Sequence, residues 1–401
     1  MPTLLQINAT ANWGSTGRIA EEIGKLVINQ GWESYIAYGR HSNPSASKLV
    51  KVGYSFEVYE HYVEHKFLDN DGLASRRATA DLIRKIKEIN PDIIHLHNIH
   101  DHWLNYKLLF EYLNTVHIPV VWTLHDCWAF TGGCAYYTYQ QCDAWQEECD
   151  KCPQRRSLID RTKEQFLTKK KLFSANKNLH VVTVSKWLEQ EVRHSFLSRH
   201  PLMTIYNGID LSVFASNPNE DIIKSYKLEG KKILLALATS WSKRKGLEDY
   251  IALSKLLPEN YVIMLVGLSE KMIKELPKNM LGIPRTSNLG ELVSLYSCAD
   301  ILLNLSYEET FGLTTVEAFA CGTPAIVYDS TASPELVTQE TGFVIEPGNI
   351  KAVFSAIEKV LNRGKSFYQQ YCRRRVEDMF DKNKTFANYI SLYKQLISKN
   401  R

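Results

Sequence analysis

Two glutamates stand on either side of a glycine-containing turn in the second half of the chain. Glu309 precedes the turn and Glu317 follows it, inside an apolar segment that we expect to be helical from about Gly312 to Gly322. On a helical wheel Glu317 falls within the apolar face, where a carboxylate is costly unless a partner satisfies it. One carboxylate therefore lies before the expected helix and the other about one turn inside it. The backbone N–H groups between them are placed to bind an anion.

The residues around the two glutamates extend this pattern. Between them lie Thr310, Phe311, Gly312 and Leu313, and after them come Ala318 and the run Gly322-Thr323-Pro324. Together these residues resemble the signature of the retaining glycosyltransferases of family four, which have the GT-B fold. The resemblance implies that Glu309 lies beside the donor sugar, that Glu317 hydrogen-bonds the nucleotide ribose, and that the amides of 310–313 hold the diphosphate. A buried Glu that caps a neighbouring element is the alternative for an isolated pair of this spacing.

A basic turn supplies positive charge for a diphosphate. The family usually carries an Arg five residues before a Lys-Gly pair; here Lys245-Gly246 is present, but the Arg position holds Ser240. The resemblance therefore assigns the diphosphate to Lys245, with Arg244 or Lys243 as substitutes for the missing Arg. A leaving diphosphate carries about two negative charges, and an exposed helix N-terminus contributes only about 0.3–1 kcal/mol to binding them. One lysine and a helix N-terminus are therefore little positive charge for this ligand. We expect the amides of 310–313 to carry more of the interaction.

A glycine-rich stretch follows the first expected strand, residues 3–9. It contains Gly14, Ser15 and Gly17, and the next residues place Ile19 and Ile23 on one helical face. Strand, glycine turn and helix open a nucleotide-binding α/β unit, in which small residues let backbone amides approach phosphate. A plain tight turn has the same pattern. The resemblance favours the first interpretation, because the family's first loop lies across from the donor diphosphate.

Histidines fall at or near the ends of expected strands in the first half of the chain. His95 and His97 belong to the strand at 92–97, and His125 follows the strand at 119–124. Ligands of a parallel sheet gather at such ends, although a structural imidazole is the commoner role for one histidine. The resemblance singles out His125 as a contact of the donor sugar near its reactive carbon. Asp126 would orient that imidazole or contact the acceptor, and His97, with His100 close by, is a second acceptor-side candidate.

Two patterns bear on metal binding. Asp69-Asn70-Asp71 follows an expected helix instead of a strand, so we interpret it as a polar turn and not as a metal-binding Asp-x-Asp motif. Residues 131–153 interrupt the α/β alternation and end in a Cys-x-x-Cys pair. Four thiols in this loop predict either a structural zinc site or reduced thiols packed among aromatic rings; they are Cys134, Cys142, Cys149 and Cys152. We expect the loop to border the acceptor pocket in both cases, and we expect no catalytic metal.

Composition and charge narrow the class of protein. The chain has 401 residues, of which 44% are hydrophobic, and a net charge of +4. These values predict a soluble globular protein of two domains and give no reason to expect a nucleic-acid partner. No secretory signal precedes the first strand, and no apolar run approaches the roughly 18 residues of a membrane span. We therefore predict a cytoplasmic location, where cysteines are thiols or metal ligands and not disulfides.

One segment suggests contact with a membrane surface. Residues 155–179 are basic and expected to be helical, with Lys169, Lys170 and Lys171 beside the apolar Phe166 and Phe173. Such a face fits anionic lipid and would suit a lipid-linked acceptor on the inner membrane face. A solvated basic helix with one apolar side on the sheet is the commoner arrangement.

Strands and helices alternate through both halves of the chain. Expected strands lie at 3–9, 92–97, 119–124, 179–184, 232–238, 261–267 and 301–305, with helices between them. The fold class is α/β, with two Rossmann-like domains of the GT-B type facing one another across a cleft. We expect an acceptor-side domain at 1–200, a nucleotide-sugar-binding domain at 201–365 with a surface linker at 211–229, and C-terminal helices at 366–401 that cross back to the first domain.

The residues and the resemblance lead to one function and two alternatives. We predict a retaining glycosyltransferase that moves a sugar from a UDP- or GDP-sugar to a glycan or lipid-linked glycan in surface polysaccharide synthesis. The resemblance implies attack from the face that the diphosphate leaves, with a phosphate oxygen taking the acceptor proton and without a protein nucleophile. One alternative is a nucleotide-sugar epimerase of the same fold, and the other is a non-catalytic protein that binds nucleotide sugar or glycan. Glu309, Phe311-Gly312 and His125-Asp126 together favour transfer.

Overall fold

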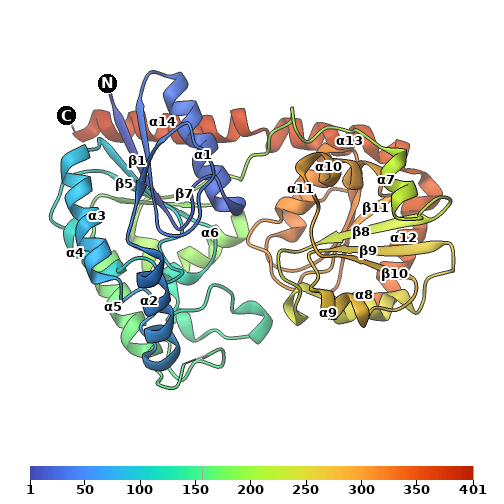
Figure 1. The fold of residues 1–401 in the computed structure, drawn as a ribbon, viewed down its shortest axis with the longest axis horizontal. Helices are drawn as coiled ribbons and strands as arrows, with labels where there is room; N and C mark the ends of the chain where they lie inside the picture. Colours follow the sequence, from blue (N-terminus) through green and yellow to red (C-terminus); the bar gives the residue numbers. More distant parts are fainter. Residues whose placement is uncertain (156, 401) are drawn as a thin grey trace. The chain divides into compact units, whose positions relative to one another are not determined.

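A computed structural model describes residues 1–155 and 157–400, which form two compact units (Figure 1). Unit 1 consists of Met1–Tyr206 and Thr385–Arg401, and unit 2 of Asn207–Lys384. Arg156, in the basic segment 155–179, and Arg401, in the C-terminal segment 366–401, lie outside the described residues. Each unit contains a parallel sheet with helices, which confirms the predicted α/β fold class.

Unit 1 alternates strands and helices from its first residues. Its strands are β1 (Thr3–Asn8), β2 (Glu33–Tyr38), β3 (Lys48–Lys51), β4 (Ile93–Leu96), β5 (Val120–Leu124), β6 (Leu179–Thr183) and β7 (Leu202–Thr204). Its helices are α1 (Gly14–Asn29), α2 (Ser55–Leu68), α3 (Arg76–Ile89), α4 (Tyr106–Leu113), α5 (Thr162–Ala175), α6 (Lys186–Arg193) and nearly all of α14 (Lys382–Asn400). Short 3₁₀ turns lie at Trp128–Phe130, Thr138–Gln140, Ala144–Gln146 and Phe196–Arg199.

Unit 2 repeats the alternation with shorter elements. Its strands are β8 (Lys232–Leu237), β9 (Tyr261–Val266), β10 (Met280–Ile283), β11 (Ile301–Asn304), β12 (Ala325–Tyr328) and β13 (Gly342–Ile345). Its helices are α7 (Glu220–Ser225), α8 (Leu247–Ser254), α9 (Glu270–Lys274), α10 (Leu289–Cys298), α11 (Leu313–Ala320), α12 (Ile350–Arg363) and α13 (Lys365–Met379). The 3₁₀ turns are η5 (Lys243–Lys245) and η6 (Ser333–Leu336).

The strand order of each sheet reverses once. The order is β3-β2-β1-β4-β5-β6-β7 in unit 1 and β10-β9-β8-β11-β12-β13 in unit 2, so the reversals fall between β1 and β4 and between β8 and β11. In open parallel sheets, ligands bind beyond the carboxyl ends of the strands at such a reversal. The segments that follow β1, β4, β8 and β11 are therefore where this topology favours a site in each unit.

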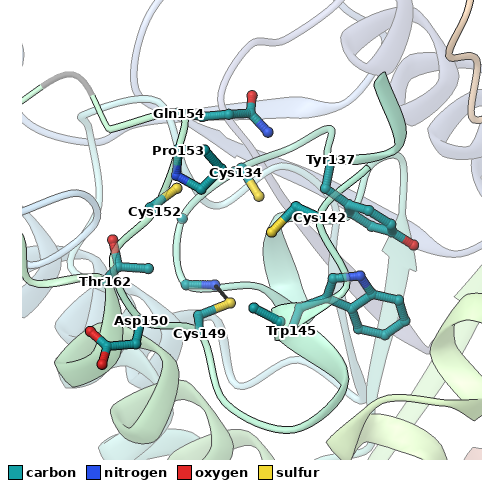
Figure 2. Close-up of a pocket in the computed structure, with 13 residues that line it drawn as sticks. Cys134, Tyr137, Cys142, Trp145, Cys149, Asp150, Cys152, Pro153, Gln154 and Thr162 are labelled. Carbon is teal, nitrogen blue, oxygen red and sulfur yellow. Dashed lines mark hydrogen bonds between the residues drawn. The ribbon is translucent and has the colours of Figure 1, made fainter. Parts of the chain in front are cut away.

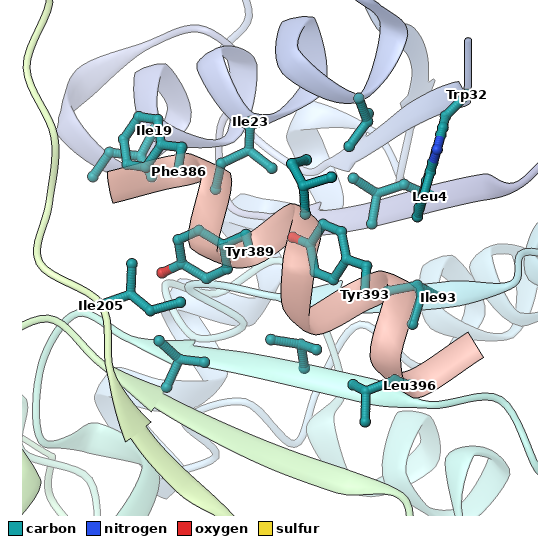
Figure 3. Packing of buried hydrophobic residues seen from close by; sticks show 14 residues of the cluster. Leu4, Ile19, Ile23, Trp32, Ile93, Ile205, Phe386, Tyr389, Tyr393 and Leu396 are labelled. Atoms are coloured by element: carbon teal, nitrogen blue, oxygen red, sulfur yellow. The ribbon is translucent and has the colours of Figure 1, made fainter. Parts of the chain in front are cut away.

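Helix α14 completes the core of unit 1 (Figure 3). Phe386, Tyr389 and Tyr393 of α14 pack in one buried cluster with Ile19 and Ile23 of α1. The hydroxyl of Tyr393 lies 2.6 Å from Nδ1 of His95, and Thr123 Oγ1 lies 2.8 Å from Nε2 of the same ring and 3.0 Å from the hydroxyl of Tyr389. His95 is thus a buried structural imidazole, and burial lowers its pKa well below the ordinary value.

Several local expectations differ from the structure. Gly14 and Gly17 belong to the first turn of α1 instead of a loop before it, and the expected linker at 211–229 contains α7. The long C-terminal helical run is divided between α13 and α14, with Phe380 and Asp381 at the break. Asp69-Asn70-Asp71 does form a turn, but the residues Asp69 and Asp71 are buried, at 7% and 8% exposure, because the turn is packed against neighbouring segments.

The three lysines of α5 do not form one solvated basic face. Lys169 is fully buried, and its ammonium donates hydrogen bonds to the carbonyls of Trp128 (2.8 Å) and Thr131 (3.3 Å) while lying 3.4 Å from the Trp128 ring centroid. Lys170 and Lys171 remain exposed. No helix among the described residues has both the length and the apolar character that a membrane crossing requires.

Candidate functional site

In unit 2, an ion pair joins the segments that follow the two strands at the reversal. Lys245 ends η5, after β8, and its Nζ lies 2.5 Å from Oε1 of Glu309, which stands between β11 and α11. Their side chains are 19% and 17% exposed, so both groups remain accessible to a ligand. The structure therefore brings together the predicted cation and the predicted sugar-binding carboxylate, although they are far apart in the sequence.

The backbone around Glu309 is fixed by hydrogen bonds from the segment after β12. Thr331 Oγ1 accepts from the N–H of Glu309 and donates to its carbonyl, both at 2.8 Å. The N–H of Ala332 also donates to that carbonyl, at 3.1 Å. Because three hydrogen bonds fix the main chain, the Glu309 side chain starts from a defined position.

The backbone around Lys245 is fixed by a close approach to β11. Gly246 has φ +74°, and a Cβ atom there would lie 2.0 Å from the carbonyl oxygen of Leu305, so only glycine fits. The Tyr250 hydroxyl donates to the carbonyl of Leu303 at 2.9 Å and accepts from the N–H of Leu305 at 3.0 Å. Arg244 donates from Nη1 to the carbonyl of Glu308 at 3.1 Å, so this candidate for the missing Arg also braces the turn.

Glu317 has the partner that its place on the apolar face of α11 requires. The hydroxyl of Tyr296, a fully buried residue of α10, donates to Oε2 of Glu317 at 2.7 Å. This bond offsets part of the cost of placing a carboxylate beside the buried Val316 and Ala320. Gly312, with φ +100°, directs the chain into α11 between the two carboxylates, and the ring of Phe311 is buried against Phe380.

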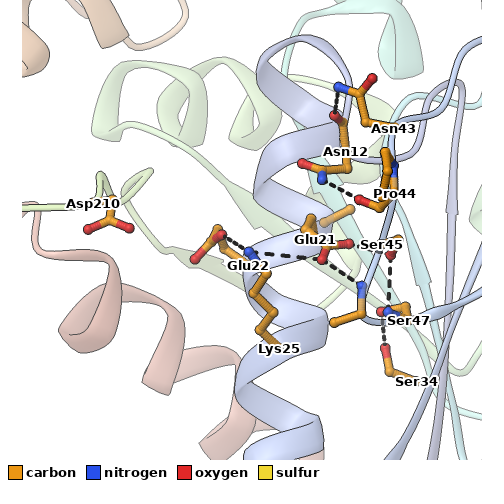
Figure 4. A network of polar contacts seen from close by, with 12 residues as sticks. Asn12, Glu21, Glu22, Lys25, Ser34, Asn43, Pro44, Ser45, Ser47 and Asp210 are labelled. Atoms are coloured by element: carbon orange, nitrogen blue, oxygen red, sulfur yellow. Dashed lines mark hydrogen bonds and ion pairs between the residues drawn. The ribbon is translucent and has the colours of Figure 1, made fainter. Parts of the chain in front are cut away.

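In unit 1, the start of α1 lies beyond β1 at the reversal of the sheet. Gly17 makes the closest approach, since a Cβ atom there would lie 2.7 Å from Oγ1 of Thr10. Figure 4 shows the polar contacts that fix this region. The buried carboxylate of Glu21 accepts hydrogen bonds from the Ser45 hydroxyl and from the N–H of Ala46, and Asn12 donates to the carbonyl of Pro44 at 2.7 Å.

A chain of three side chains ends at His125. Oε1 of Gln6 lies 3.1 Å from Nε2 of His97, and Nδ1 of His97 lies 3.1 Å from Nε2 of His125. Burial lowers the pKa of His125 to about 4 and that of His97 well below its ordinary value, so both rings are neutral at pH 7. His97 is only 1% exposed, so it is not accessible to a ligand; its hydrogen bond instead positions the ring of His125.

Asp126 is engaged by a different histidine. Its Oδ2 lies 2.9 Å from Nε2 of His100, and its Oδ1 accepts from the N–H of Trp128 at 2.9 Å. Burial acts to lower the pKa of His100, but Asp126 and Asp101 outweigh it and raise that pKa well above the ordinary value. An imidazolium paired with a carboxylate thus lies one residue from the neutral His125.

The four cysteines of the irregular loop surround one pocket (Figure 2). Its cavity volume is about 20 Å³, close to the space of one water molecule. Burial raises the pKa of Cys134 to about 12 and that of Cys149 to about 11, and all four residues are free thiols. Within the part of the chain that the structure describes, no three of these sulfur atoms lie within 4.8 Å of one another.

Comparison with known proteins assigns a family to this arrangement. The model described as Glycosyltransferase Family 4 matches residues 16–213, and the model described as Glycosyl transferases group 1 matches residues 218–376. The chain belongs to the family-four glycosyltransferases. The resemblance seen in the sequence is thereby confirmed, and the chain is a glycosyltransferase with the fold class expected for GT-B.

Individual relatives of this glycosyltransferase agree with that assignment. The chain is 25% identical over 363 residues to the putative colanic acid biosynthesis glycosyl transferase WcaC of Escherichia coli, covering 84% of this chain and 86% of that one. It is 23% identical over 237 residues to the capsular polysaccharide biosynthesis glycosyltransferase CapM of Staphylococcus aureus, covering 55% and 62%. Among solved structures, Anabaena HepE in complex with UDP and glucose has a TM-score of 0.67 at 15% identity, covering 98% and 99%, and shares the fold.

Some residues that hold the candidate site residues in place were not predicted. Tyr296, Thr331 and Gln6 each hold a predicted residue in place by a hydrogen bond, at 2.7, 2.8 and 3.1 Å respectively. The sequence did indicate that Glu317 needs a partner, because it lies on an apolar helix face, and Tyr296 is that partner. Thr331 and Gln6 carried no such signal, because they lie in segments with no recognisable motif.

The contact between Gly246 and Leu305 predicts a specific effect on stability. Gly246→Ala should lower the unfolding midpoint in calorimetry because its methyl group meets the Leu305 carbonyl, and overpacking costs about 1–3 kcal/mol. Gly230→Ala is the matched control, since Gly230 also has positive φ, at +70°, but no atom lies within 4 Å of its Cβ position. The control should show only the left-handed strain of about 1–2 kcal/mol. Equal shifts in the two variants would contradict the importance of this contact.

Proposed function

We propose that this glycosyltransferase is a retaining enzyme that transfers a sugar from a nucleoside diphosphate sugar to a glycan acceptor in surface polysaccharide synthesis. The observation that carries the proposal is the Lys245–Glu309 pair at the strand reversal of unit 2, at 2.5 Å. A donor undergoing cleavage develops negative charge on the leaving diphosphate and positive charge on the sugar. The cation Lys245 would stabilise the first charge and the carboxylate of Glu309 the second. The names of WcaC and CapM support a polysaccharide product.

In this proposal, unit 2 binds the donor. Lys245 moves from Glu309 to the diphosphate, which also contacts the amides of 310–313 at the start of α11, because cations and helix N-termini attract anions. Glu309 is then released to bind the sugar hydroxyls and to stabilise the oxocarbenium-like charge. Glu317 binds the ribose through one carboxylate oxygen. The other oxygen, Oε2, accepts the hydrogen bond from the Tyr296 hydroxyl. Arg244, already at the turn, is a weaker second cation in place of the Arg that Ser240 replaces.

Unit 1 supplies the remaining contacts in this proposal. Gly14, Ser15 and Gly17 approach the diphosphate at the start of α1. The neutral ring of His125 hydrogen-bonds the donor sugar near its reactive carbon, and Asp126 with His100 forms the acceptor side. We place His97 behind His125 as a positioning residue, since it is buried between Gln6 and that ring. The acceptor attacks from the face that the diphosphate leaves, and a phosphate oxygen takes its proton.

The donor and acceptor classes follow from the same set of observations. We propose a UDP-sugar before a GDP-sugar, supported by the UDP bound to HepE, whose fold this chain shares. For the acceptor we propose a lipid-linked glycan, supported by the exposed Lys170 and Lys171 on α5 and by the exposed aromatic rings of Tyr54, Phe56 and Tyr59 at the start of α2. These residues offer a contact with an anionic membrane surface.

We also propose that the cysteine loop binds a structural zinc ion. The support is chemical, since four thiols line one small pocket, and a bound cation would reverse the rise in thiol pKa that burial causes. In a tetrahedral site with Zn–S bonds of about 2.3 Å, the sulfur atoms lie about 3.8 Å apart. Binding therefore requires the loop to contract around the ion.

Transfer activity tests the donor site. Lys245→Met and Glu309→Gln should each lower transfer of a labelled sugar from UDP- or GDP-sugar by at least about 100-fold, because each removes charge stabilisation used in the transition state. Lys255→Met is the control, because it removes an exposed lysine from the C-terminal end of α8, outside the proposed site. Circular dichroism checks that all three variants are folded.

The same assay separates the competing functions. Full activity in Lys245→Met and Glu309→Gln would overturn the site assignment. A new epimeric nucleotide sugar without transfer would favour the epimerase, and binding without any product would favour a non-catalytic binding protein. Lipid-linked glycan in anionic vesicles and the free glycan are supplied in parallel, and equal transfer to both would contradict the proposed lipid-linked acceptor.

Cobalt replacement tests the zinc site in the cysteine loop. Co²⁺ added to metal-free protein should give an intense near-ultraviolet thiolate-to-metal band, and Cys152→Ser should reduce that band strongly because it removes one ligand. Cys298→Ser is the control, since Cys298 is a free thiol in unit 2, outside the loop. If wild-type protein shows no thiolate band, the loop holds reduced thiols instead.

A further inference from the structure

A group of metal-ligating side chains that the proposed reaction does not use lies in unit 1. His65 is in the last turn of α2, Asp71 is in the turn that follows it, and His102 is in the loop after β4. One ligand atom from each residue lies within 4.8 Å of the other two, and this is the one such triad of His, Cys, Asp or Glu within the described residues. The rings of His65 and His102 are 4.9 Å apart, centroid to centroid.

Two ring nitrogens in this group are buried without a hydrogen-bond partner. They are Nδ1 of His65 and Nε2 of His102, and both have almost no contact with solvent. The nearest carboxylate oxygen to His65 Nδ1 outside the triad is Oδ1 of Asp69 at 3.8 Å, which is too long for a hydrogen bond. Buried polar atoms normally have partners, so two unpartnered ring nitrogens in a group that also contains the buried Asp71 indicate that the group can bind a ligand.

A neighbouring side chain orients the carboxylate of the triad in the way that metal-ligating carboxylates are oriented. Oδ2 of Asp71 accepts a hydrogen bond of 2.8 Å from Nε1 of Trp128, which orients the carboxylate. His61 differs from the two triad histidines, because Ser75 and the backbone of Asn70 and Gly72 satisfy both of its nitrogens. Its bonds fix the turn that presents Asp71.

The backbone at His102 is strained. Asp101 and His102 have φ values of +77° and +64°, and two consecutive left-handed residues other than glycine are uncommon. Strain of this kind persists where the surrounding structure requires one side-chain position, and it gathers at ligand sites. Here it places the His102 ring beside His65.

We propose that His65, Asp71 and His102 bind a divalent transition-metal ion of the zinc type. Two imidazoles and one carboxylate form a ligand set that zinc prefers, and water would take the fourth position. Ligands about 2.1 Å from one ion lie about 3.4 Å apart in a tetrahedral site, so the rings need only a small movement. This site is separate from the cysteine loop, and it does not depend on the proposed glycosyl transfer.

The ion would stabilise the loops around Asp126. Asp71 contacts Trp128 through the indole N–H, the main-chain N–H of Trp128 donates to Asp126, and Asp126 pairs with His100, two residues before His102. A metal at the triad would add a direct link between His102 and Asp71. The contacts would then connect α2, the loop after β4 and the segment after β5 in one closed network. The network would fix Asp126 without the metal touching a substrate.

Cobalt binding to the purified full chain tests this proposal independently of activity. Co²⁺ on imidazole and carboxylate ligands gives weak visible bands without a thiolate band, so the two sites can be told apart in one titration. Wild-type protein should bind one equivalent that produces only visible bands. His65→Ala and His102→Asn should each lose that equivalent, and asparagine tolerates the left-handed backbone at position 102. His117→Asn, which changes an exposed histidine, is the control.

The outcomes separate the proposal from its alternatives. Loss of one cobalt equivalent and of its weak visible absorption in both triad variants, with the control unchanged and any thiolate band retained, supports the site. Wild-type protein without such bands would overturn it. Equal cobalt stoichiometry in wild-type protein, the triad variants and the control would overturn it as well. The wild-type measurement stands even if a variant fails to fold.

Discussion

The ion pair between Lys245 and Glu309 is the interaction on which the proposed donor site depends. It joins two segments that leave neighbouring strands, β8 and β11, at the one place where the strand order of unit 2 reverses. The pair is partly exposed, so the ammonium can be attracted by a ligand of greater negative charge. Gly246, Tyr250 and Thr331 all act on the backbone beside it, which means that the two charged groups are positioned before a ligand arrives.

In unit 1 the polar side chains are positioned by chains of hydrogen bonds instead of by a single ion pair. Its polar groups form two short chains, Gln6–His97–His125 and Trp128–Asp126–His100, in which buried residues support a partly exposed end. The first chain is neutral because burial lowers the pKa of both histidines, and the second contains an ion pair because two carboxylates outweigh burial at His100. A neutral hydrogen-bonding ring and a charged pair thus lie side by side in one unit.

Much of the fold was predictable because its signals are local. Strand β9 is a continuous apolar run and β5 is nearly one, and α11 begins directly after a glycine and ends before a glycine and a proline. The short strands β3 and β7 have no such run, and β10 includes a glycine, so they went unpredicted. The burial of Lys169 and Asp71 depends on contacts between distant segments, which periodicity within a segment does not contain.

Candidate site residues could be named from the sequence where a family motif contains them, but the residues that hold them in place could mostly not be named. Glu309, Glu317, Lys245 and His125 all follow from motifs. The pairing of Lys245 with Glu309 and of Asp126 with His100 is a property of the folded chain, because residues 64 and 26 positions apart make these contacts. The triad of His65, Asp71 and His102 had no sequence signature, since its ligands come from three segments with irregular spacing.

The most direct measurement is the affinity of a nucleoside diphosphate relative to its monophosphate, by calorimetric titration of UDP and UMP, or of GDP and GMP. If Lys245 leaves Glu309 to bind the diphosphate, wild-type protein should favour the diphosphate by about 1.5–3 kcal/mol, roughly 10- to 140-fold. Lys245→Met should lose most of that preference, while Lys255→Met should keep it. An unchanged preference in Lys245→Met would contradict the central claim, because the diphosphate would then be bound without the cation that pairs with Glu309.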